Sequence, residues 1–373
     1  MSEKRILLMY ISEVSGHHNA TLAIEKALKT LDPHVSILNI NSFKYTNPLL
    51  EKIINKAYMG VIKRTPKVWE YLYDNPGFIK KTQRIKDAIH KANFRKFDVL
   101  FEEFNPTAVV CTQAFPCGLI ADYKRVYGVK VPLIGVLTDF SPHAYWVYNE
   151  VDYYIVPSEE AKKRFLTEGI PEYKIKLLGI PIDPRFSRPH SRREIAKRLQ
   201  LDLSIPTILV MGGGQGIGPI RHIVTALNKF SGDLQVMVVA GTNRKLLKWL
   251  EKKKPELVKK FLIFKYVNNI EELMEVASFI ISKPGGLTTA EALAKGLPMI
   301  IIKPIPGQEE NNTEFLLRNG VAIKIDRMDH AHTELERLIK NEGRLIEMQE
   351  SAQRLGKPTS AVDAARLILR AHV

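Results

Sequence analysis

Short apolar runs alternate with longer amphipathic segments along almost the whole chain. Apolar runs of strand length, separated by patterns with the period of a helix, are typical of a parallel sheet whose strands are joined by helices. We therefore predict an α/β protein. The runs in the first half span residues 6–11, 35–40, 108–112, 133–137, 153–156 and 175–178, and those in the second half span residues 207–211, 234–240, 262–266, 279–281, 299–302 and 322–325.

The two sets of runs predict two Rossmann-like, doubly wound domains that face each other across a cleft. At 373 residues the chain is larger than one typical domain, for which about 150 residues is usual. Residues 179–189 contain three prolines and separate the two sets of runs. We place the boundary there, with domains of residues 1–185 and 186–373. A last helix, at about residues 360–371, has apolar positions with which to pack back on the first domain.

The cysteine content and the apolar stretches limit the cellular setting. Cys111 and Cys117 have no histidine or cysteine neighbours at metal-ligand spacing, so we expect neither a zinc site nor a disulfide framework. No apolar stretch approaches the roughly 20 residues that cross a bilayer, and the first apolar run is too short for a signal peptide. We expect a cytoplasmic protein whose membrane association, if any, is peripheral.

The net charge of +15 is concentrated in residues 41–100, which hold 13 Lys and Arg against 5 Asp and Glu. Residues 49–62 repeat adjacent apolar pairs every four residues with lysines between them, which predicts a basic amphipathic helix. Lysines and aromatic rings together favour an anionic membrane surface. Taken alone, such a helix is more often a core-packing helix with a charged outer side, and we rank the membrane surface higher only in combination with the sites described below. Nucleic acid is not expected as a partner because no recognition motif accompanies the charge. The aromatic residues that follow are Trp69, Tyr71, Tyr73 and Phe78.

A glycine turn in the second half has the features of a nucleotide-sugar site. The apolar run 279–281 leads into Gly285–Gly286, where backbone amides can approach a phosphate, and we expect Thr288 and Thr289 to cap the helix that follows. Glu291, one turn into that helix, can accept hydrogen bonds from two ribose hydroxyls. An ordinary strand-to-helix turn is the alternative, and the polar cluster of residues 308–312, which suits a hexose, favours the nucleotide sugar.

A second glycine cluster, residues 212–218, also follows an apolar run and permits close approach of a phosphate or sugar. Its spacing is not that of a dinucleotide fingerprint. The acid about 20 residues further on, Asp233, precedes the next run instead of ending it. A nicotinamide-dependent enzyme is therefore disfavoured.

Polar residues also follow two runs of the first half, at the strand ends where α/β proteins bind ligands. His17 and His18 follow the first run, and a histidine can accept a proton from an alcohol near neutral pH. We prefer His17 as the base because Gly16 precedes it, although a capping or buried role fits at least one of the pair. The second group can form an acceptor pocket or a packed loop; it contains Asp139, His143, Tyr145 and Trp146.

In combination, these motifs resemble the monogalactosyldiacylglycerol synthase and processive diacylglycerol glucosyltransferase family over nearly the whole chain. The turn of residues 15–18 is less glycine-rich than the version common in that family, so the choice between His17 and His18 stays open. The residues that carry the resemblance are Gly16, His17, Thr138, Asp139, His143, Trp146, residues 283–286, Glu291, Ala292, residues 304–309 and Asn312.

The resemblance implies a glycosyltransferase B-type fold, a UDP-glucose or UDP-galactose donor, inversion at the anomeric carbon, and neither a cofactor nor a catalytic metal. Backbone amides and a helix terminus can stabilise the departing UDP in place of a metal. By similarity to the more distant peptidoglycan-precursor transferase, the expected donor contacts are Tyr266, Val267 and Ile270 at the uracil, Gly285, Gly286, Leu287 and Thr288 at the diphosphate, Glu291 at the ribose, and Gln308, Glu309 and Asn312 at the hexose; Lys283, Gly213 and Gly214 complete the donor site.

The mechanism that the resemblance implies is direct attack by the hydroxyl of diacylglycerol on the donor. His17 removes the proton, and Asp139 orients or polarises His17. The residues expected to contact the acceptor are His18, His143, Tyr145 and Trp146. The first domain would bind the acceptor and the inner face of the cell membrane, and the second domain would bind the UDP-sugar. Three alternatives stay open: another lipid acceptor, a UDP-sugar epimerase, and a non-catalytic UDP-sugar sensor. The sequence also leaves open glucose or galactose, processivity and the oligomeric state.

Overall fold

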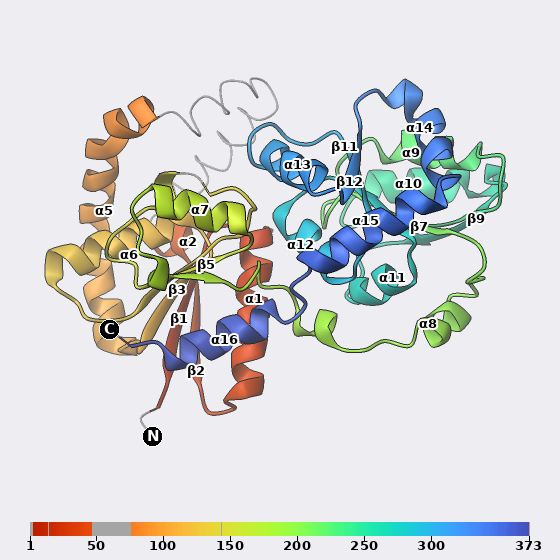
Figure 1. Cartoon of the computed structure of the whole chain (residues 1–373). Helices are drawn as coiled ribbons and strands as arrows, with labels where there is room; N and C mark the ends of the chain where they lie inside the picture. The colour runs from red at the N-terminus through yellow and green to blue at the C-terminus, as the bar shows by residue number, and fades with distance from the viewer. Residues whose placement is uncertain (1–2, 14, 47–75, 143, 373) are drawn as a thin grey trace. The chain divides into compact units, whose positions relative to one another are not determined.

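The computed structural model describes residues 3–13, 15–46, 76–142 and 144–372. The chain forms two compact units, which are described separately here (Figure 1). The first unit comprises Met1–Pro184, Pro306–Gln308 and Thr359–Val373, and the second comprises Arg185–Ile305 and Glu309–Pro358. The predicted basic helix at residues 49–62, the aromatic residues Trp69, Tyr71 and Tyr73, and His143 lie outside the described residues.

The first unit is built on a sheet of six parallel strands in the order β2-β1-β3-β4-β5-β6. Leu7 of β1 lies between Leu38 of β2 and Val109 of β3 in the register of the sheet. The strands are β1 (Arg5–Tyr10), β2 (Ser36–Asn41), β3 (Ala108–Cys111), β4 (Leu133–Val136), β5 (Tyr153–Val156) and β6 (Ile175–Leu177).

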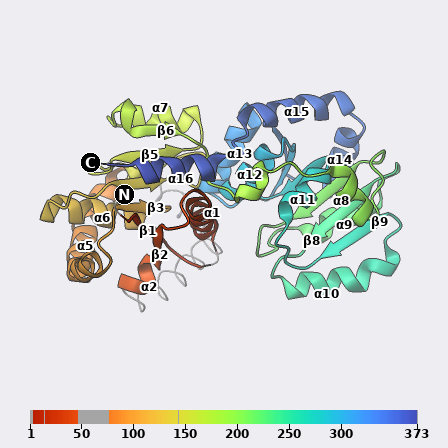
Figure 2. The same ribbon diagram turned by 90° about the horizontal axis from the view of Figure 1, so that it is seen from below.

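Helices cover both faces of this sheet (Figures 1 and 2). Successive strand residues point to opposite faces, so Ile6 and Leu8 are buried with α1 and α16, whereas Leu7 and Met9 are buried with α5 and α6. Apolar runs with no polar alternation are what a strand covered on both faces requires. The helices are α1 (Gly16–Leu31), α2 (Ser42–Thr46), α5 (Pro76–Phe104), α6 (Ala114–Tyr127), α7 (Glu159–Thr167) and α16 (Ser360–Arg370), and single 3-10 turns lie at Ala144–Trp146 and Glu172–Lys174.

The last helix, α16, belongs to the first unit although it follows the whole second unit in sequence. Its residues Ala361, Ala364, Ala365 and Ile368 are buried in the cluster that also contains α1. The spacing i, i+3, i+4, i+7 of these four places them on one face of the helix. Of the apolar positions that the sequence offered, Val362, Leu367 and Leu369 are only partly buried.

The second unit repeats the architecture with strand order β12-β11-β10-β7-β8-β9. All twelve predicted runs form strands, which confirms the α/β class; the largest shift is in β9, which begins and ends two residues before the predicted run. The strands are β7 (Thr207–Met211), β8 (Gln235–Val239), β9 (Lys260–Phe264), β10 (Phe279–Ser282), β11 (Met299–Ile302) and β12 (Ala322–Ile325). The helices are α8 (Arg192–Arg198), α9 (Ile220–Asn228), α10 (Arg244–Lys253), α11 (Ile270–Val276), α12 (Gly286–Ala294), α13 (Gln308–Arg318), α14 (Ala331–Ile339) and α15 (Glu342–Leu355), with 3-10 turns at Pro184–Ser187, Lys254–Glu256 and Met328–His330.

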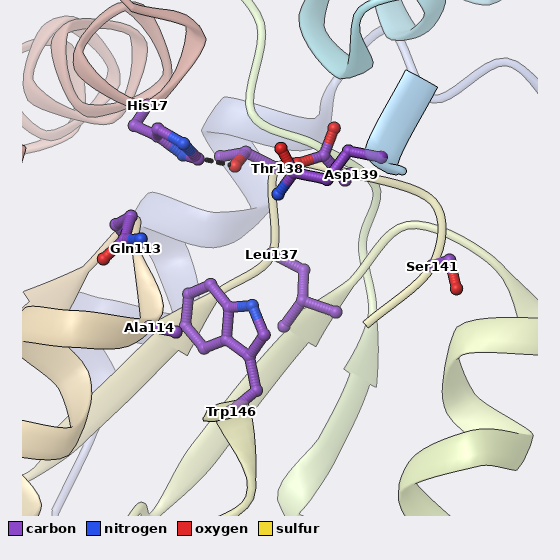
Figure 3. A pocket seen from close by; sticks show the side chains of 9 residues that line it. His17, Gln113, Ala114, Leu137, Thr138, Asp139, Ser141 and Trp146 are labelled. Carbon is purple, nitrogen blue, oxygen red and sulfur yellow. Dashed lines mark hydrogen bonds between the residues drawn. The ribbon is translucent and has the colours of Figure 1, made fainter. Parts of the chain in front are cut away.

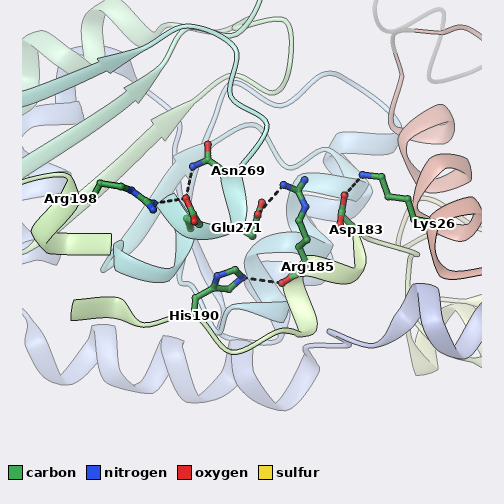
Figure 4. A network of polar contacts seen from close by, with 8 residues as sticks. Lys26, Asp183, Arg185, His190, Arg198, Asn269 and Glu271 are labelled. Atoms are coloured by element: carbon green, nitrogen blue, oxygen red, sulfur yellow. Dashed lines mark hydrogen bonds and ion pairs between the residues drawn. The ribbon is translucent and has the colours of Figure 1, made fainter. Parts of the chain in front are cut away.

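The chain passes from the first unit to the second between Pro184 and Arg185, within the proline-containing stretch. Polar contacts hold the chain on each side of this point (Figure 4). In the first unit Lys26 Nζ lies 2.5 Å from Asp183 Oδ2, and in the second unit Arg185 lies 3.0 Å from the buried carboxylate of Glu271. Pro184 is therefore flanked by residues that are each fixed within their own unit.

Candidate active site

The strand order of each sheet identifies one strand pair beside which a ligand is expected. In an open parallel sheet, ligands bind at the carboxyl ends of the two adjacent strands whose following connections run in opposite directions along the sheet. In the first sheet these strands are β1 and β3, and in the second they are β7 and β10. His17 follows β1, and the glycine clusters follow β7 and β10, so the predicted chemistry falls at these positions in both units.

His17 lies in the first turn of α1, and two threonines contact its ring, of which Figure 3 shows Thr138. Its Nδ1 atom lies 3.1 Å from the carbonyl oxygen of Thr112 and 2.6 Å from the hydroxyl oxygen of Thr138. A carbonyl oxygen only accepts hydrogen bonds, so the neutral imidazole carries its hydrogen on Nδ1 and its lone pair on Nε2. In this tautomer Nε2 is the ring nitrogen that can accept a proton.

The surroundings keep His17 uncharged. Burial away from water lowers the pKa of His17 to about 4, and the hydrogen bond to the Thr112 carbonyl only partly opposes this shift. A location at the N-terminal end of α1 also disfavours a positive charge. At neutral pH the Nε2 lone pair is therefore free of a proton and available to accept one.

His17 lines a small hollow that has a polar end and an apolar wall (Figure 3). Asp139 and Thr138 lie at the polar end, whereas Leu137 and Trp146 provide apolar surface. Trp146 is only 4% exposed, because most of its ring packs in the core of the first unit. Tyr145 is partly buried against the same core. The other lining residues in the first unit are Gln113, Ala114, Ser141 and Gln308, of which Gln308 is expected at the hexose.

His18 has a different environment. Its Nδ1 atom lies 2.8 Å from the carbonyl oxygen of Glu13, and its ring stacks on Tyr10 with 4.2 Å between the ring centroids. His18 lies outside the set of residues that line the hollow. The geometry therefore favours His17 as the base.

The ring of His17 is oriented by two residues to which the sequence analysis assigned no such role. Thr112 and Thr138 both lie within hydrogen-bond distance of His17 Nδ1, whereas the orienting role was expected of Asp139. The hydroxyl of Thr21 lies 2.9 Å from that of Thr112, which extends the network into α1. Thr112 is the last residue of one predicted run and Thr138 directly follows another, and these positions at strand ends were the available signal.

The glycine turn of the second unit begins α12 earlier than the sequence indicated. The helix starts at Gly286 with Gly285 as its N-cap residue, and no side chain caps it. The expected capping by Thr288 and Thr289 is therefore wrong: Thr289 is buried within the first turn, with its backbone N–H bonded to Gly285 O at 2.9 Å. Without a capping side chain, the first backbone N–H groups of α12 remain available to an anion.

The loop after β7 is compact because glycines allow it to fold against residues 240–243. A Cβ atom at Gly216 would lie 2.0 Å from Ala240 O, and one at Gly241 would lie 2.3 Å from Gly214 O. Gly213 has φ +64° and faces open space, and Gly214 lies beside the ring of Tyr266. The loop thus presents backbone rather than side chains at the end of β7.

The residues expected at the uracil follow β9. Tyr266 is 55% exposed, Val267 is half-buried, and Ile270 is the first residue of α11. An exposed aromatic ring next to Gly214 offers a flat surface for a nucleobase.

Two of the residues expected at the hexose are held by protein contacts. The carboxylate of Glu309 lies 2.8 Å from Lys283 Nζ and accepts a hydrogen bond from Ile305 N at 2.7 Å. Asn312 is fully buried and its amide donates to Pro284 O at 2.9 Å, so it fixes the turn that precedes α12. Gln308 is the first residue of α13, and Glu291 lies half-buried on α12.

Neither unit, within the described residues, brings together three or more His, Cys, Asp or Glu side chains in a way that could hold a metal ion. Among the described helices, none combines the length and the apolar character needed to cross a membrane.

Comparison with known proteins places the chain in a class. Residues 207–367 match the glycosyltransferase family 28 C-terminal domain, and residues 17–182 match the monogalactosyldiacylglycerol (MGDG) synthase family. The fold is that of the solved MurG from Acinetobacter baumannii, with a TM-score of 0.62 at 15% identity over 99% of this chain and 100% of that one. A UDP-GlcNAc 2-epimerase from Neisseria meningitidis, solved with UDP-GlcNAc, has a TM-score of 0.61 at 13% identity over 98% of this chain and 100% of that one.

These findings define a two-domain glycosyltransferase with the B-type fold. The first domain is similar to the MGDG synthase family, and the second domain is similar to the family 28 C-terminal domain. A relative that spans nearly the same length is a protein of Bacillus cereus (strain AH187) named processive diacylglycerol beta-glucosyltransferase. The two are 29% identical over 363 residues, which cover 96% of this chain and 91% of that one.

Proposed function

We propose that this protein transfers a hexose from a UDP-sugar to the hydroxyl of diacylglycerol, with inversion at the anomeric carbon. The observation that carries the proposal is the state of His17, whose Nδ1 hydrogen is fixed by Thr112 and Thr138 and whose Nε2 lone pair is left for the acceptor. The relatives' names supply the substrate class, because they specify a diacylglycerol glucosyltransferase.

The chemistry follows from these groups. The hydroxyl oxygen of diacylglycerol attacks the anomeric carbon while its proton passes to His17 Nε2. The bond from the anomeric carbon to the UDP oxygen breaks, and its electron pair leaves with UDP. The uncapped amides at the start of α12 stabilise the negative charge on the diphosphate. Because one displacement occurs, an α-linked donor gives a β-linked product.

We further propose that the donor site uses backbone amides rather than a metal, and that the protein works at the surface of an anionic membrane. The uncapped helix start supports the first point. The excess of Lys and Arg in residues 41–100 supports the second, since each basic residue near an anionic surface contributes about 1 kcal/mol.

The test is product formation by the purified protein on anionic vesicles that contain diacylglycerol. UDP-glucose and UDP-galactose are supplied separately, and each lipid product is identified by mass spectrometry. A glycosyldiacylglycerol from either donor supports the proposal and identifies the sugar. A changed nucleotide sugar without any lipid product would instead indicate an epimerase, and UDP-sugar binding without any reaction would indicate a sensor.

A further inference from the structure

A second concentration of positive charge lies on α10, in the donor-binding unit. The ten residues of this helix include five Lys and Arg and a single acid, Glu251. Arg244, Lys248 and Lys252 are spaced four residues apart, so they share one face of the helix. Lys245 lies next to them, and all four side chains are exposed. We call these four residues the basic face of α10.

The basic face is not neutralised within the protein. Many surface cations of this chain pair with a carboxylate, for example Lys29 with Glu25 and Lys340 with Glu336. Among the described residues, by contrast, no ion pair involves any member of the basic face. The face is therefore open to an external anionic partner.

The arrangement of these cations is unfavourable for the helix itself. Arg244 and Lys245 lie in the first turn of α10, where the helix dipole favours acids and where no acid is present. Arg244, Lys248 and Lys252 form two like-charge pairs at i, i+4, which also destabilise a helix. Since these charges do not help α10 to fold, an external anionic partner accounts for them better than stability does.

The rest of α10 holds the basic face rigidly. Leu246 and Leu250 are 4% and 0% exposed and pack in the core of the second unit, and Trp249 packs against the same core. The guanidinium of Arg221 on α9 lies 5.4 Å from the centre of the Trp249 ring and extends the positive region. Figure 2 shows α10 on the outside of the unit beside β9.

We propose that the basic face of α10 is a contact surface for anionic phospholipid headgroups, by which the donor-binding unit itself docks on the membrane. The inference rests on the proposed function, because it takes the acceptor to be a bilayer lipid. Three of the four residues are lysines, whose point charges suit a fluid array of phosphates. A surface for single-stranded nucleic acid would favour exposed aromatic rings for stacking, whereas the ring of Trp249 is half-buried beneath Arg221.

The test uses co-sedimentation of the full chain with phosphatidylcholine vesicles, with and without phosphatidylglycerol, at low salt. The vesicles contain no diacylglycerol, so the result does not depend on turnover and separates this inference from the proposed function. The test variant is Arg244→Gln/Lys248→Gln/Lys252→Gln. The matched control is Arg337→Gln/Lys340→Gln/Arg344→Gln, which removes the same charge from exposed positions of the same unit.

We expect the α10 variant to bind phosphatidylglycerol vesicles on the order of a hundredfold more weakly, at roughly fivefold per charge. The control should lose much less, and both variants should bind UDP as the wild type does. Equal losses in the two variants, or no loss in either, would overturn the proposal. Tighter binding of the wild type to duplex DNA than to these vesicles, abolished in the α10 variant, would also overturn it. If the triple variant fails to bind UDP, the single change Lys248→Glu replaces it and should weaken vesicle binding in the same direction.

Discussion

The hydroxyl oxygen of Thr138 lies 2.6 Å from Nδ1 of His17, although 121 residues separate the two in sequence. The carbonyl of Thr112 accepts from the same nitrogen and so determines that Nδ1 holds the hydrogen, which the Thr138 hydroxyl can also accept. The proposed role of His17 as the base depends on these contacts.

Replacing His17 by Ala should lower kcat by about 10²-fold to 10⁴-fold, because that is the usual contribution of a general base. The affinity for UDP should not change, since the residues expected to bind it belong to the other unit. Steady-state kinetics and calorimetric titration with UDP measure the two quantities. His18→Gln is the control and should retain most of the activity; if it lost as much as His17→Ala, the base would have to be reassigned.

Thr138→Val should remove the hydroxyl that contacts His17 while keeping the shape of the side chain. We expect kcat to fall roughly threefold to tenfold, the value of one hydrogen bond, with little change in KM for the UDP-sugar. Ser141→Ala, at another position of the same hollow, serves as the control. An unchanged kcat for Thr138→Val would mean that Thr112 alone orients the ring.

The pH dependence should show the low pKa of His17. With a folded pKa of about 4, the base stays unprotonated down to roughly pH 5, so kcat should not decline near pH 6.5 as it would for an ordinary histidine. The sign for stability follows from the same shift. Between pH 6.5 and 4 the unfolded chain binds a proton that the folded protein does not, so stability falls as the pH is lowered.

Urea unfolding at pH 7.5 and pH 5 tests this linkage. The loss of stability at pH 5 should be smaller in His17→Gln than in the wild type, because glutamine does not titrate. An identical loss in the two proteins would show that burial does not lower the pKa of His17.

Two glycines of the loop after β7 should respond differently to alanine. Gly213 and Gly216 have similar positive φ angles, so each substitution carries backbone strain of about 1–2 kcal/mol. Only Gly216→Ala adds a clash, since its Cβ would lie 2.0 Å from Ala240 O. We expect Gly216→Ala to weaken UDP binding and lower stability well beyond Gly213→Ala. UDP affinity is measured by calorimetry and stability by urea unfolding. If the two variants lost equal affinity and equal stability, close packing at Gly216 would have no role in this loop.

Ile368→Ala should destabilise the first unit by about 2–5 kcal/mol, because Ile368 is 1% exposed in the cluster that joins α16 to α1. Leu367→Ala, at a partly buried position of the same helix, should cost less. Thermal unfolding of both variants measures the difference. A similar loss of stability in the two variants would contradict the burial of α16 on the first sheet.

The sequence predicted the strands well and the local start of a helix less well. Strands such as β7 and β11 are buried on both faces, so their apolar runs have clear ends. The start of α12 was misplaced because threonines usually cap helices, whereas here Gly285 begins the helix without a side-chain cap.

In the candidate site, too, some features could be predicted from the sequence and others could not. His17 was identifiable because it follows a strand, but its contact with Thr138 depends on the neighbouring positions of β1, β3 and β4 in the sheet, which the sequence does not specify. Asn312 was expected to meet the sugar, and the structure shows it buried with its amide bonded to Pro284 O. Its contact with the hexose stays a prediction, and the bond to Pro284 O is a structural role that the motif alone does not indicate.

The most direct test of the account is the configuration of the glycosidic bond in the lipid product. The protein is incubated with UDP-glucose or UDP-galactose and diacylglycerol vesicles, and the product is examined by proton NMR. Direct attack by a hydroxyl that His17 deprotonates predicts a β-linked glycosyldiacylglycerol from the α-linked donor. An α-linked product would contradict the mechanism, and the absence of any lipid product with a protein that binds UDP would contradict the proposed function.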